Sequence, residues 1–235
     1  MMEQLESGIV LIDKPAGLTS HNVVQEVKKR LKAKRAGHSG TLDSNVTGVL
    51  LVALNESRKA MPVLIGLKKE YQGIMLLHKD IGKHDLEKIC KGFVGKITQT
   101  PPVRSRVVRK PREREIYSFK IKKIQGRDIS FKVSCESGTY IRKLVHDIGL
   151  KTGGAHLIHL RRTRVGPFTD KQCVSLENLS EKNIIGLEKI LEKLRIKKIF
   201  VKNSAIKKVQ NGNPIYSENI RKMDKIIEGE TIGIF

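Results

Sequence analysis

The sequence of 235 residues predicts a mixed fold of strands and helices, either α/β or α+β. Short runs in which apolar and polar residues alternate, typical of half-buried strands, interleave with stretches whose apolar residues recur at helical spacing. The chain is long enough to bury a sizeable core as one large domain, or as one domain with a small appendage. Spacing alone does not choose between the two classes, because it does not say which strands pair.

The first part of the chain contains two strand candidates and one well-marked helix. Residues 8–12 are an apolar strand that stops at Lys14-Pro15-Ala16-Gly17, where proline and glycine favour a turn. A helix capped by Thr19 or Ser20 follows. It has an apolar face and a basic face: Val23, Val24, Val27 and Leu31 against Lys28, Lys29, Arg30, Lys32, Lys34 and Arg35. The apolar run 49–54 is a core strand or the buried turn of a helix.

The elements after residue 55 alternate between helix and strand. The stretch 60–67 has helical spacing but is disturbed by Pro62, which has no N–H to donate. The clearest signal is a hairpin that turns at Gln125-Gly126-Arg127-Asp128. In order, the predicted elements are a strand at 69–77, a helix at 85–93, alternating strands at Tyr117, Phe119 and Ile121 and at Ile129, Phe131, Val133 and Cys135, a helix at 140–150 ended by Gly153-Gly154, a strand at 157–164, and short helices at 175–180 and 184–194.

The composition points to a nucleic-acid partner. The chain has 46 Lys and Arg against 24 Asp and Glu, a formal net charge of +22 and a pI of about 10.0. Nucleic acid is the commonest partner of a strongly basic protein, although a general lysine bias would also raise the charge. The segment 104–114 concentrates arginines and contains Pro111. We expect an exposed loop or edge segment there, either in contact with phosphates or merely solvated.

The sequence argues against a membrane protein, a secreted disulfide scaffold and a metal protein. No apolar run approaches membrane-spanning length, and the N-terminus lacks the basic and apolar regions of a signal peptide. Cys90, Cys135 and Cys173 are odd in number and widely spaced, without the paired spacing of zinc ligands. We therefore expect a cytoplasmic protein without a bound metal.

The stretch from Ala36 to Leu54 carries the strongest functional pattern. Asp43 follows Gly37 and Gly40, which allow tight turns and the close approach of a ligand. A polar group on a loop held by a rigid scaffold is a common setting for catalysis. From turn chemistry alone, however, an Asp beside Ser and Asn more often caps a turn.

Four motifs resemble the TruB/dyskerin family of pseudouridine synthases and occur in that family's order. They are GIVLIDKPAGLTS at 8–20, GHSGTLDSNVTGVL at 37–50, SGTYIR at 137–142, and GAH at 154–156 with LRRTR at 160–164. The resemblance covers about residues 8 to 180. Two further stretches look more like the archaeal and eukaryotic branch: QTPPVRS at 99–105 and RRTRVGPF at 161–168.

The resemblance implies an α+β fold with a central mixed, mostly antiparallel sheet flanked by helices. It implies that Asp43 is the catalytic residue, that Arg142 pairs with it, and that no cofactor or metal is required. Four residues match family positions that contact the flipped uridine: Tyr71 as the stacking partner, Tyr140 as a pocket wall, Leu160 as an apolar contact, and His38. Lys14 either contacts a phosphate or caps its own turn.

We expect a catalytic domain at residues 1–182 and a C-terminal segment at 183–235, a helix followed by the opening of a PUA-like domain. In the family's guided members that domain holds the guide RNA, so its shortened form leaves two substrates open. They are a T-loop uridine of tRNA, and rRNA bound through a guide RNA together with the partner proteins of an H/ACA particle. The alternative is a non-catalytic RNA-binding scaffold, which the joint presence of Asp43, Tyr71 and Arg142 argues against.

Overall fold

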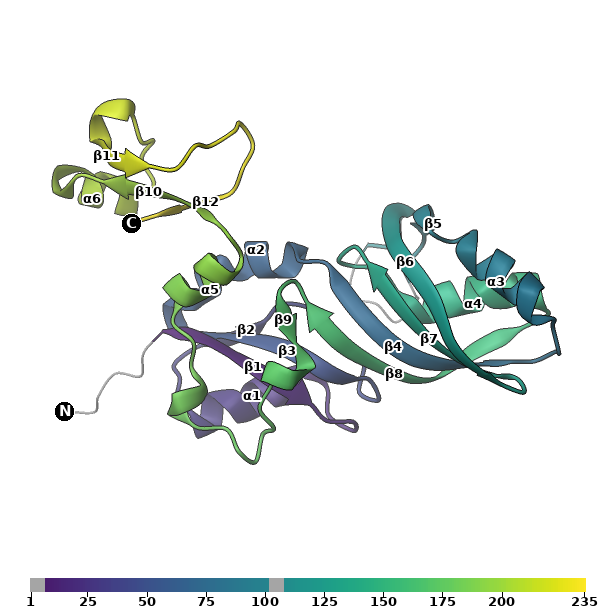
Figure 1. The fold of residues 1–235 in the computed structure, drawn as a ribbon. Coiled ribbons are helices and arrows are strands. Elements are labelled where there is room, and N and C mark those ends of the chain that lie inside the picture. Colours follow the sequence, from purple (N-terminus) through teal and green to yellow (C-terminus); the bar gives the residue numbers. More distant parts are fainter. Residues whose placement is uncertain (1–6, 102–107) are drawn as a thin grey trace. The chain divides into compact units, whose positions relative to one another are not determined.

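The computed structural model describes residues 7–101 and 108–235, and the chain divides into two compact units (Figure 1). The first unit is Met1–Ile185 and the second is Gly186–Phe235. Most of the QTPPVRS motif and the beginning of the arginine-rich segment, residues 102–107, lie outside the described residues.

The first unit is organised around a mixed sheet, which has nine strands over the described residues. Its main path is β1-β3-β8-β4-β7-β6-β5, while β2 also pairs with β3 and β9 pairs with β8. The strands are β1 Gly8–Lys14, β2 Ala36–His38, β3 Thr47–Leu54, β4 Lys69–Leu77, β5 Gly95–Gln99, β6 Arg112–Gln125, β7 Asp128–Cys135, β8 Ala155–Val165 and β9 Phe168–Thr169. Their pairings are antiparallel except that of β3 with β8. The α+β fold with a central, mostly antiparallel sheet is therefore confirmed.

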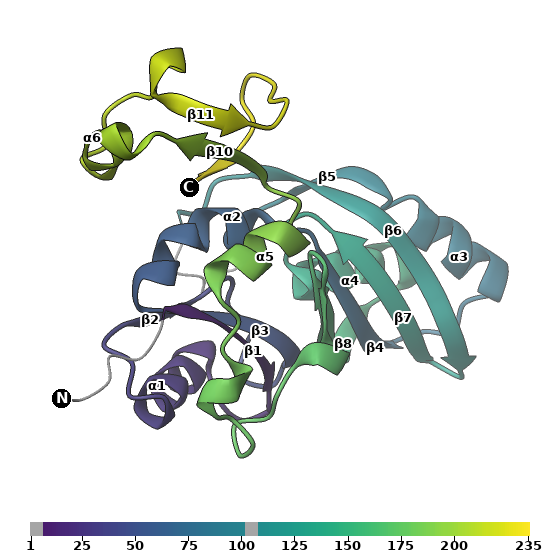
Figure 2. The same cartoon turned by 60° about the vertical axis from the view of Figure 1, so that its left-hand side comes forward.

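The α-helices of the first unit are α1 Ser20–Arg30, α2 Met61–Gly66, α3 Lys83–Lys91 and α4 Ile141–Thr152. Helix α1 begins where expected, because the Thr19 hydroxyl accepts the Asn22 N–H at 3.1 Å. Helix α4 ends at Gly153, whose φ of +79° favours glycine. Figure 2 shows α3 and α4 beside the strands β5, β6 and β7. In the part of the chain that the structure describes, no helix is long and apolar enough to cross a bilayer.

Two buried clusters fix α1, α3 and α4 on the sheet. The larger one packs Leu144 of α4 against Met75 of β4 and Phe131 of β7. The other packs α1 against β1 and β3 through residues such as Val23 and Leu50. Full burial of one such side chain contributes roughly 1.5–3 kcal/mol. The apolar stripes read from the sequence therefore decide which helix face meets which half of the sheet.

The two halves of the sheet meet where β3 lies beside β8. The parallel pairing consists of Thr47↔Arg161 and Gly48↔Arg162. Gly48 has a φ of +102°, and a Cβ on it would lie 2.2 Å from the carbonyl oxygen of Arg162. Glycine is required here both for the backbone angle and for the close approach of the two chains. Because β3 directly follows the Asp43 loop, this junction fixes one end of that loop.

The structure corrects two predictions about local geometry. Pro62 does not disturb its helix, because it lies in the first turn of α2, where a missing N–H removes no helical hydrogen bond. Tyr117 does not share the buried face of its strand. An irregularity in the pairing between Ile116 and Ser118 leaves Tyr117 45% exposed while Ile116 is fully buried.

The structure also corrects the prediction of helices at 175–180 and 184–194. The stretch 175–180 is not helical, and the chain before it lies along β1, where the Val174 N–H donates to the Leu11 carbonyl at 2.9 Å. Ile185 likewise exchanges two 2.9 Å backbone hydrogen bonds with Ile9. These apolar residues extend the sheet edge, so the helix expected at 184–194 begins only at α5 Leu187–Lys193.

The second unit contains α5, α6 Ile206–Gln210 and a small three-stranded sheet of order β11-β10-β12. Its strands are β10 Lys197–Val201, β11 Ile220–Met223 and β12 Ile232–Ile234. Its buried core is formed by Ile199, Val201 and Ala205. A core this small supplies little hydrophobic stabilisation. The domain boundary at 182/183 and the PUA-like assignment stay predictions.

Alanine at Gly48 should break the junction between the sheet halves. Gly17 is the matched control, because its φ is +88° but nothing lies within 4 Å of an added Cβ. We expect Gly17→Ala to cost about 1–3 kcal/mol of backbone strain. Gly48→Ala should lower the free energy of unfolding by at least about 2 kcal/mol more, because two strands must also move apart. Denaturant unfolding measures both, and equal losses would contradict the importance of the junction.

Candidate active site

Asp43 lies in the loop between β2 and β3, and the backbone before it is firmly held. The Ser20 hydroxyl donates to the Leu42 carbonyl at 3.0 Å and accepts the Leu42 N–H at 2.8 Å. The Leu42 side chain is buried in the larger core cluster. The Asp43 carbonyl closes a turn by accepting the Val46 N–H at 3.0 Å. An exposed carboxylate therefore stands on a fixed backbone.

Lys14 holds the other side of this loop. Its side chain is fully buried, and its ammonium donates at 2.7, 2.6 and 3.0 Å to the carbonyl oxygens of Pro15, Leu18 and Ser44. Burial lowers the pKa of Lys14, while the charge of Asp43 acts in the opposite direction. All three N–H donors of the ammonium are used within the protein. This geometry favours the turn-capping interpretation of Lys14 over direct contact with a phosphate.

Arg142, near the start of α4, donates from its guanidinium to the carboxylate of Asp43. The two side chains remain 62% and 58% exposed, respectively. An exposed ion pair contributes at most about 1 kcal/mol to folding, so stability does not explain this pair. The exposure leaves the carboxylate open to a ligand.

Gln99, which the sequence analysis did not single out, sets the start of α4. It ends β5 and is 2% exposed. Its side-chain amide donates to the Tyr140 carbonyl at 3.2 Å and accepts the Tyr140 N–H at 3.0 Å. Tyr140 is half-buried and directly precedes α4. Gln99 thereby fixes the turn of chain from which Arg142 reaches Asp43.

Tyr71 and Leu160 lie on the neighbouring strands β4 and β8, in the same buried cluster as Leu42. Tyr71 is 7% exposed. Burial raises the pKa of its phenol, so the hydroxyl stays neutral at physiological pH. The charge of Asp43 also acts on this phenol in the same direction, which places the two side chains within electrostatic reach of each other.

Arg162 connects these parts, and it is 1% exposed. Its guanidinium donates to the Val49 carbonyl at 2.7 Å and to the Gly40 carbonyl at 3.1 Å. Its charge also acts on the phenol of Tyr71, whose pKa it lowers against the larger effect of burial. In the sequence, Arg162 stands out only as part of the LRRTR motif at 160–164. Strand alternation could have found it, because position 162 falls on the same face as the apolar Leu160.

Two basic side chains near Arg162 have lowered pKa values. Burial, followed by the charge of Arg162, lowers the pKa of His38 below its usual 6.5. The Gly40 N–H donates to Nδ1 of His38 at 3.3 Å, so the proton of the neutral ring is assigned to Nε2. The same two causes, in the same order, lower the pKa of Lys69 to about 8. The imidazole is therefore uncharged near pH 7 and can donate a hydrogen bond to a polar ligand.

The structure thus brings most of the predicted site residues together. Asp43 contacts Arg142, and its charge reaches Tyr71 and Lys14. Tyr140 is linked to Asp43 through Arg142, two residues further along the chain. The two remaining predicted residues are Leu160, which lies in the cluster with Tyr71, and His38, whose ring accepts the Gly40 N–H.

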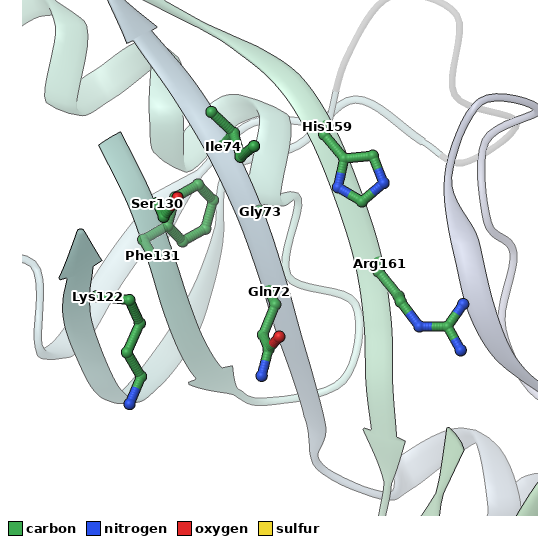
Figure 3. A pocket seen from close by; sticks show the side chains of 8 residues that line it. All are labelled: Gln72, Gly73, Ile74, Lys122, Ser130, Phe131, His159 and Arg161. Atoms are coloured by element: carbon green, nitrogen blue, oxygen red, sulfur yellow. The ribbon is translucent and has the colours of Figure 1, made fainter. Parts of the chain in front are cut away.

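A separate hollow of about 370 Å³ lies on the opposite face of the sheet (Figure 3). It is lined by Gln72, Gly73, Ile74, Lys122, Ser130, Phe131, His159 and Arg161. Gln72 alternates along β4 with the buried Tyr71 and therefore points away from the cluster that contains Tyr71. Arg161, whose guanidinium points away from Gln72 in Figure 3, is held by two ion pairs with aspartates. This hollow is distinct from the Asp43 site.

The fold and the site together define a pseudouridine synthase. A mixed sheet carries an exposed Asp–Arg pair beside a buried tyrosine, as the motif resemblance implies. Residues 28–141 match the TruB family pseudouridylate synthase (N terminal domain), and residues 142–200 match the tRNA pseudouridylate synthase B C-terminal domain. The chain belongs to the TruB family of pseudouridine synthases.

Individual relatives agree with this assignment. The chain is 44% identical over 235 residues to the probable tRNA pseudouridine synthase B of Methanococcus maripaludis, covering 94% of this chain and 71% of the relative. It resembles a chain in the crystal structure of a Cbf5-Nop10-Gar1 complex, with 38% identity, a TM-score of 0.85, and coverage of 98% of this chain and 75% of that one. It also resembles a chain in the structure of an H/ACA RNP bound to a substrate RNA containing 2'-deoxyuridine. That match has 36% identity, a TM-score of 0.82, and coverage of 98% of this chain and 75% of that one. The predicted family and enzyme class are confirmed.

Removing the guanidinium of Arg162 should destabilise the fold. We expect Arg162→Met to lower the free energy of unfolding by about 2–5 kcal/mol, because buried carbonyls lose their donors. Arg164→Met is the matched control on the same strand. Arg164 is exposed, so its substitution should cost no more than about 0.5 kcal/mol. Denaturant unfolding measures both variants, and similar small losses would show that Arg162 does not hold the loop.

Lys69 should give stability a distinctive pH dependence. Its folded pKa is about 8 against an ordinary 10.5. Between these values the unfolded chain binds a proton that the folded chain does not, so this group makes stability rise with pH from about 8 to 10.5. The free energy of unfolding of the parent should therefore rise relative to that of Lys69→Met between pH 7.5 and 9.5. The exposed neighbour Lys68, changed to Met, should show no such trend; a flat difference for Lys69→Met would contradict the assignment.

Proposed function

We propose that this enzyme isomerises uridine to pseudouridine in RNA with Asp43 as its catalytic carboxylate. The observation that carries this proposal is the setting of Asp43. Its side chain is 58% exposed and its carboxylate is paired with Arg142, while the backbone on both sides is held by Ser20 and Lys14. A reactive group held in place before the substrate arrives lowers the entropic part of the barrier.

The reaction needs one well-placed carboxylate. The bond between N1 of uracil and C1′ of ribose breaks, the base turns, and a new bond joins C5 to C1′. C5 gives up its proton and N1 gains one, so atoms and electrons balance without a redox partner. Asp43 can attack the sugar as a nucleophile or remove a proton as a base, and both roles use the same carboxylate. Arg142 supplies a positive charge beside it.

A uridine in folded RNA must leave its stack before Asp43 can reach it. We propose that Tyr71, Tyr140 and Leu160 form the walls that receive the flipped base, with His38 as a hydrogen-bond donor. Tyr71 and Leu160 supply buried apolar surface next to the loop. Stacking and apolar contact of this kind offset the cost of unstacking.

Two RNA substrates fit the proposal. The relative in Methanococcus maripaludis is named for tRNA, and the similar solved chains belong to a Cbf5-Nop10-Gar1 complex and to an H/ACA RNP with substrate RNA. We therefore propose a T-loop uridine of tRNA, or rRNA presented by a guide RNA together with H/ACA partner proteins. The net charge of +22 supports an RNA partner in either case. We place the enzyme in the cytoplasm with these RNAs.

The C-terminal residues 183–235 are proposed to be a helix followed by part of a PUA-like RNA-binding segment. The small sheet of β10, β11 and β12 and its basic composition support this reading. It would add phosphate contacts to those made by residues 1–182.

Replacing Asp43 should separate turnover from binding. We expect Asp43→Asn to lower the release of tritium from uridine C5 by roughly 10²–10⁴-fold or more, while RNA affinity changes little. Arg142→Gln should also lower turnover. Its thermal stability should stay near that of the parent, because the ion pair is exposed. A parent chain that binds RNA without releasing tritium would instead support a scaffold role.

The substrate is decided by supplying each RNA in turn. We expect release either from a tRNA transcript alone, or only when guide RNA, target RNA and partner proteins are present. The first result identifies a stand-alone tRNA enzyme, and the second identifies the catalytic subunit of a guided particle. No release under either condition would contradict the proposed function.

A further inference from the structure

A rigid turn brings two exposed arginines together at the end of β2 that is remote from Asp43. The turn leads from α1 into β2 and is fastened to the residue that follows β3. The side-chain oxygen of Asn55 accepts the N–H groups of Lys34 and Arg35 at 3.1 and 3.2 Å. The Asn55 N–H donates to the Arg35 carbonyl at 2.8 Å. These three bonds fix the backbone from which Arg35 projects.

Arg58 approaches the same strand from the next turn of the chain, the short 3-10 helix η1 Asn55–Ala60. A Cβ placed on Gly37 of β2 would lie 3.8 Å from Nε of Arg58. The Arg58 side chain therefore lies against the bare backbone of β2. Arg35 immediately precedes the same strand. We call Lys34, Arg35 and Arg58 the β2 cationic cluster; all three side chains are exposed.

Among the described residues, no carboxylate forms an ion pair with a member of the β2 cationic cluster. Glu56 is the acidic side chain that feels the charge of the cluster: the pKa of Glu56 is lowered first by Lys59 and then also by Arg35 and Arg58. Glu56 is, however, ion-paired to Lys59 at 2.7 Å. A surplus of fixed positive charge therefore faces solvent.

Strand β2 connects this cluster to the proposed catalytic loop. β2 runs from Ala36 to His38, and the chain then continues through Gly40 to Asp43. Ala36 pairs with Leu54, whereas the Asp43 loop precedes Thr47 at the other end of β3, so the 8 residues of β3 separate the cluster from the loop by roughly 26 Å. An RNA strand whose uridine reaches Asp43 can reach Arg35 and Arg58 only if it continues over this distance along β2.

We propose that the β2 cationic cluster binds the phosphodiester backbone of the RNA strand that flanks the target uridine. Guanidinium groups suit this role, because each presents a planar fork of donors to phosphate oxygens. The fixed backbone at Asn55 reduces the ordering cost for Arg35. This inference rests on the proposed function for the identity of the RNA, but its test does not require turnover.

The test is the salt dependence of RNA binding. A tRNA transcript is titrated with Asp43→Asn protein, in which we expect turnover to be largely lost, and with the same protein carrying Arg35→Gln and Arg58→Gln. Each lost phosphate contact lowers the slope of log K against log salt by roughly 0.7–0.9, so the double change should lower it by about 1.4–1.8. Lys88→Gln with Lys91→Gln on α3 is the matched control, because both lysines are exposed and the charge change is equal.

The outcomes separate the cluster from general electrostatics. A slope reduced by the arginine changes and nearly unchanged by the lysine changes supports the proposal. Equal reductions, or no reduction for the arginines, would overturn it. Phosphate ethylation locates the contact: interference in the strand that flanks the target uridine should disappear in the arginine variant. If the chain with Asp43 intact releases no tritium, the proposed function fails while these binding results still decide the role of the cluster.

Discussion

The short parallel junction between β3 and β8 carries the geometry of the whole site. β1 and β3 form one half of the main sheet of the first unit, with α1 packed against it. β4 to β8 form the other half, with α3 and α4 packed against it. The halves pair through Thr47↔Arg161 and Gly48↔Arg162, and the buried guanidinium of Arg162 adds bonds to the carbonyls of Gly40 and Val49. Asp43 lies between Gly40 and Gly48, while Arg142 belongs to the other half. The distance between carboxylate and guanidinium is therefore set by this junction, because neither exposed side chain is held by packing.

The buried polar side chains around the loop mainly fix where the backbone runs, rather than add to the stability of the fold. Lys14 and Ser20 hold the residues on either side of Asp43, and Gln99 holds the start of α4. Each makes its bonds to backbone atoms, so each fixes where the chain runs and leaves the neighbouring side chains free to act. Tyr71 and Leu160 belong to the same buried cluster as Leu42, so apolar side chains lie next to the loop while Asp43 stays exposed. Such an arrangement suits a reaction in which an extruded base must be received and held.

Local pattern was enough for most elements, but not for the residues that join them. Strand β4, the β6–β7 hairpin and α4 follow from alternation, turn residues and helical spacing, which are properties of neighbouring residues. The hydrogen bonds of Arg162 and Gln99 could not be predicted in this way, because their partners lie 113 and 41 residues away in the chain. Tyr117 was misplaced because a single irregular step in the pairing shifts which residues face inward. The Asp–Arg pairing came from the motif resemblance, since no spacing rule links residues 43 and 142.

The most direct measurement is the single-turnover release of tritium from uridine C5 by Asp43→Glu, compared with the parent. Glutamate keeps the carboxylate but moves it by one methylene on the same fixed backbone. If the loop holds Asp43 at its working position, displacement of about 1 Å should lower the rate by roughly 100-fold while RNA affinity is retained. A rate within tenfold of the parent would contradict the claim that the junction of β3 and β8 positions a catalytic carboxylate at residue 43.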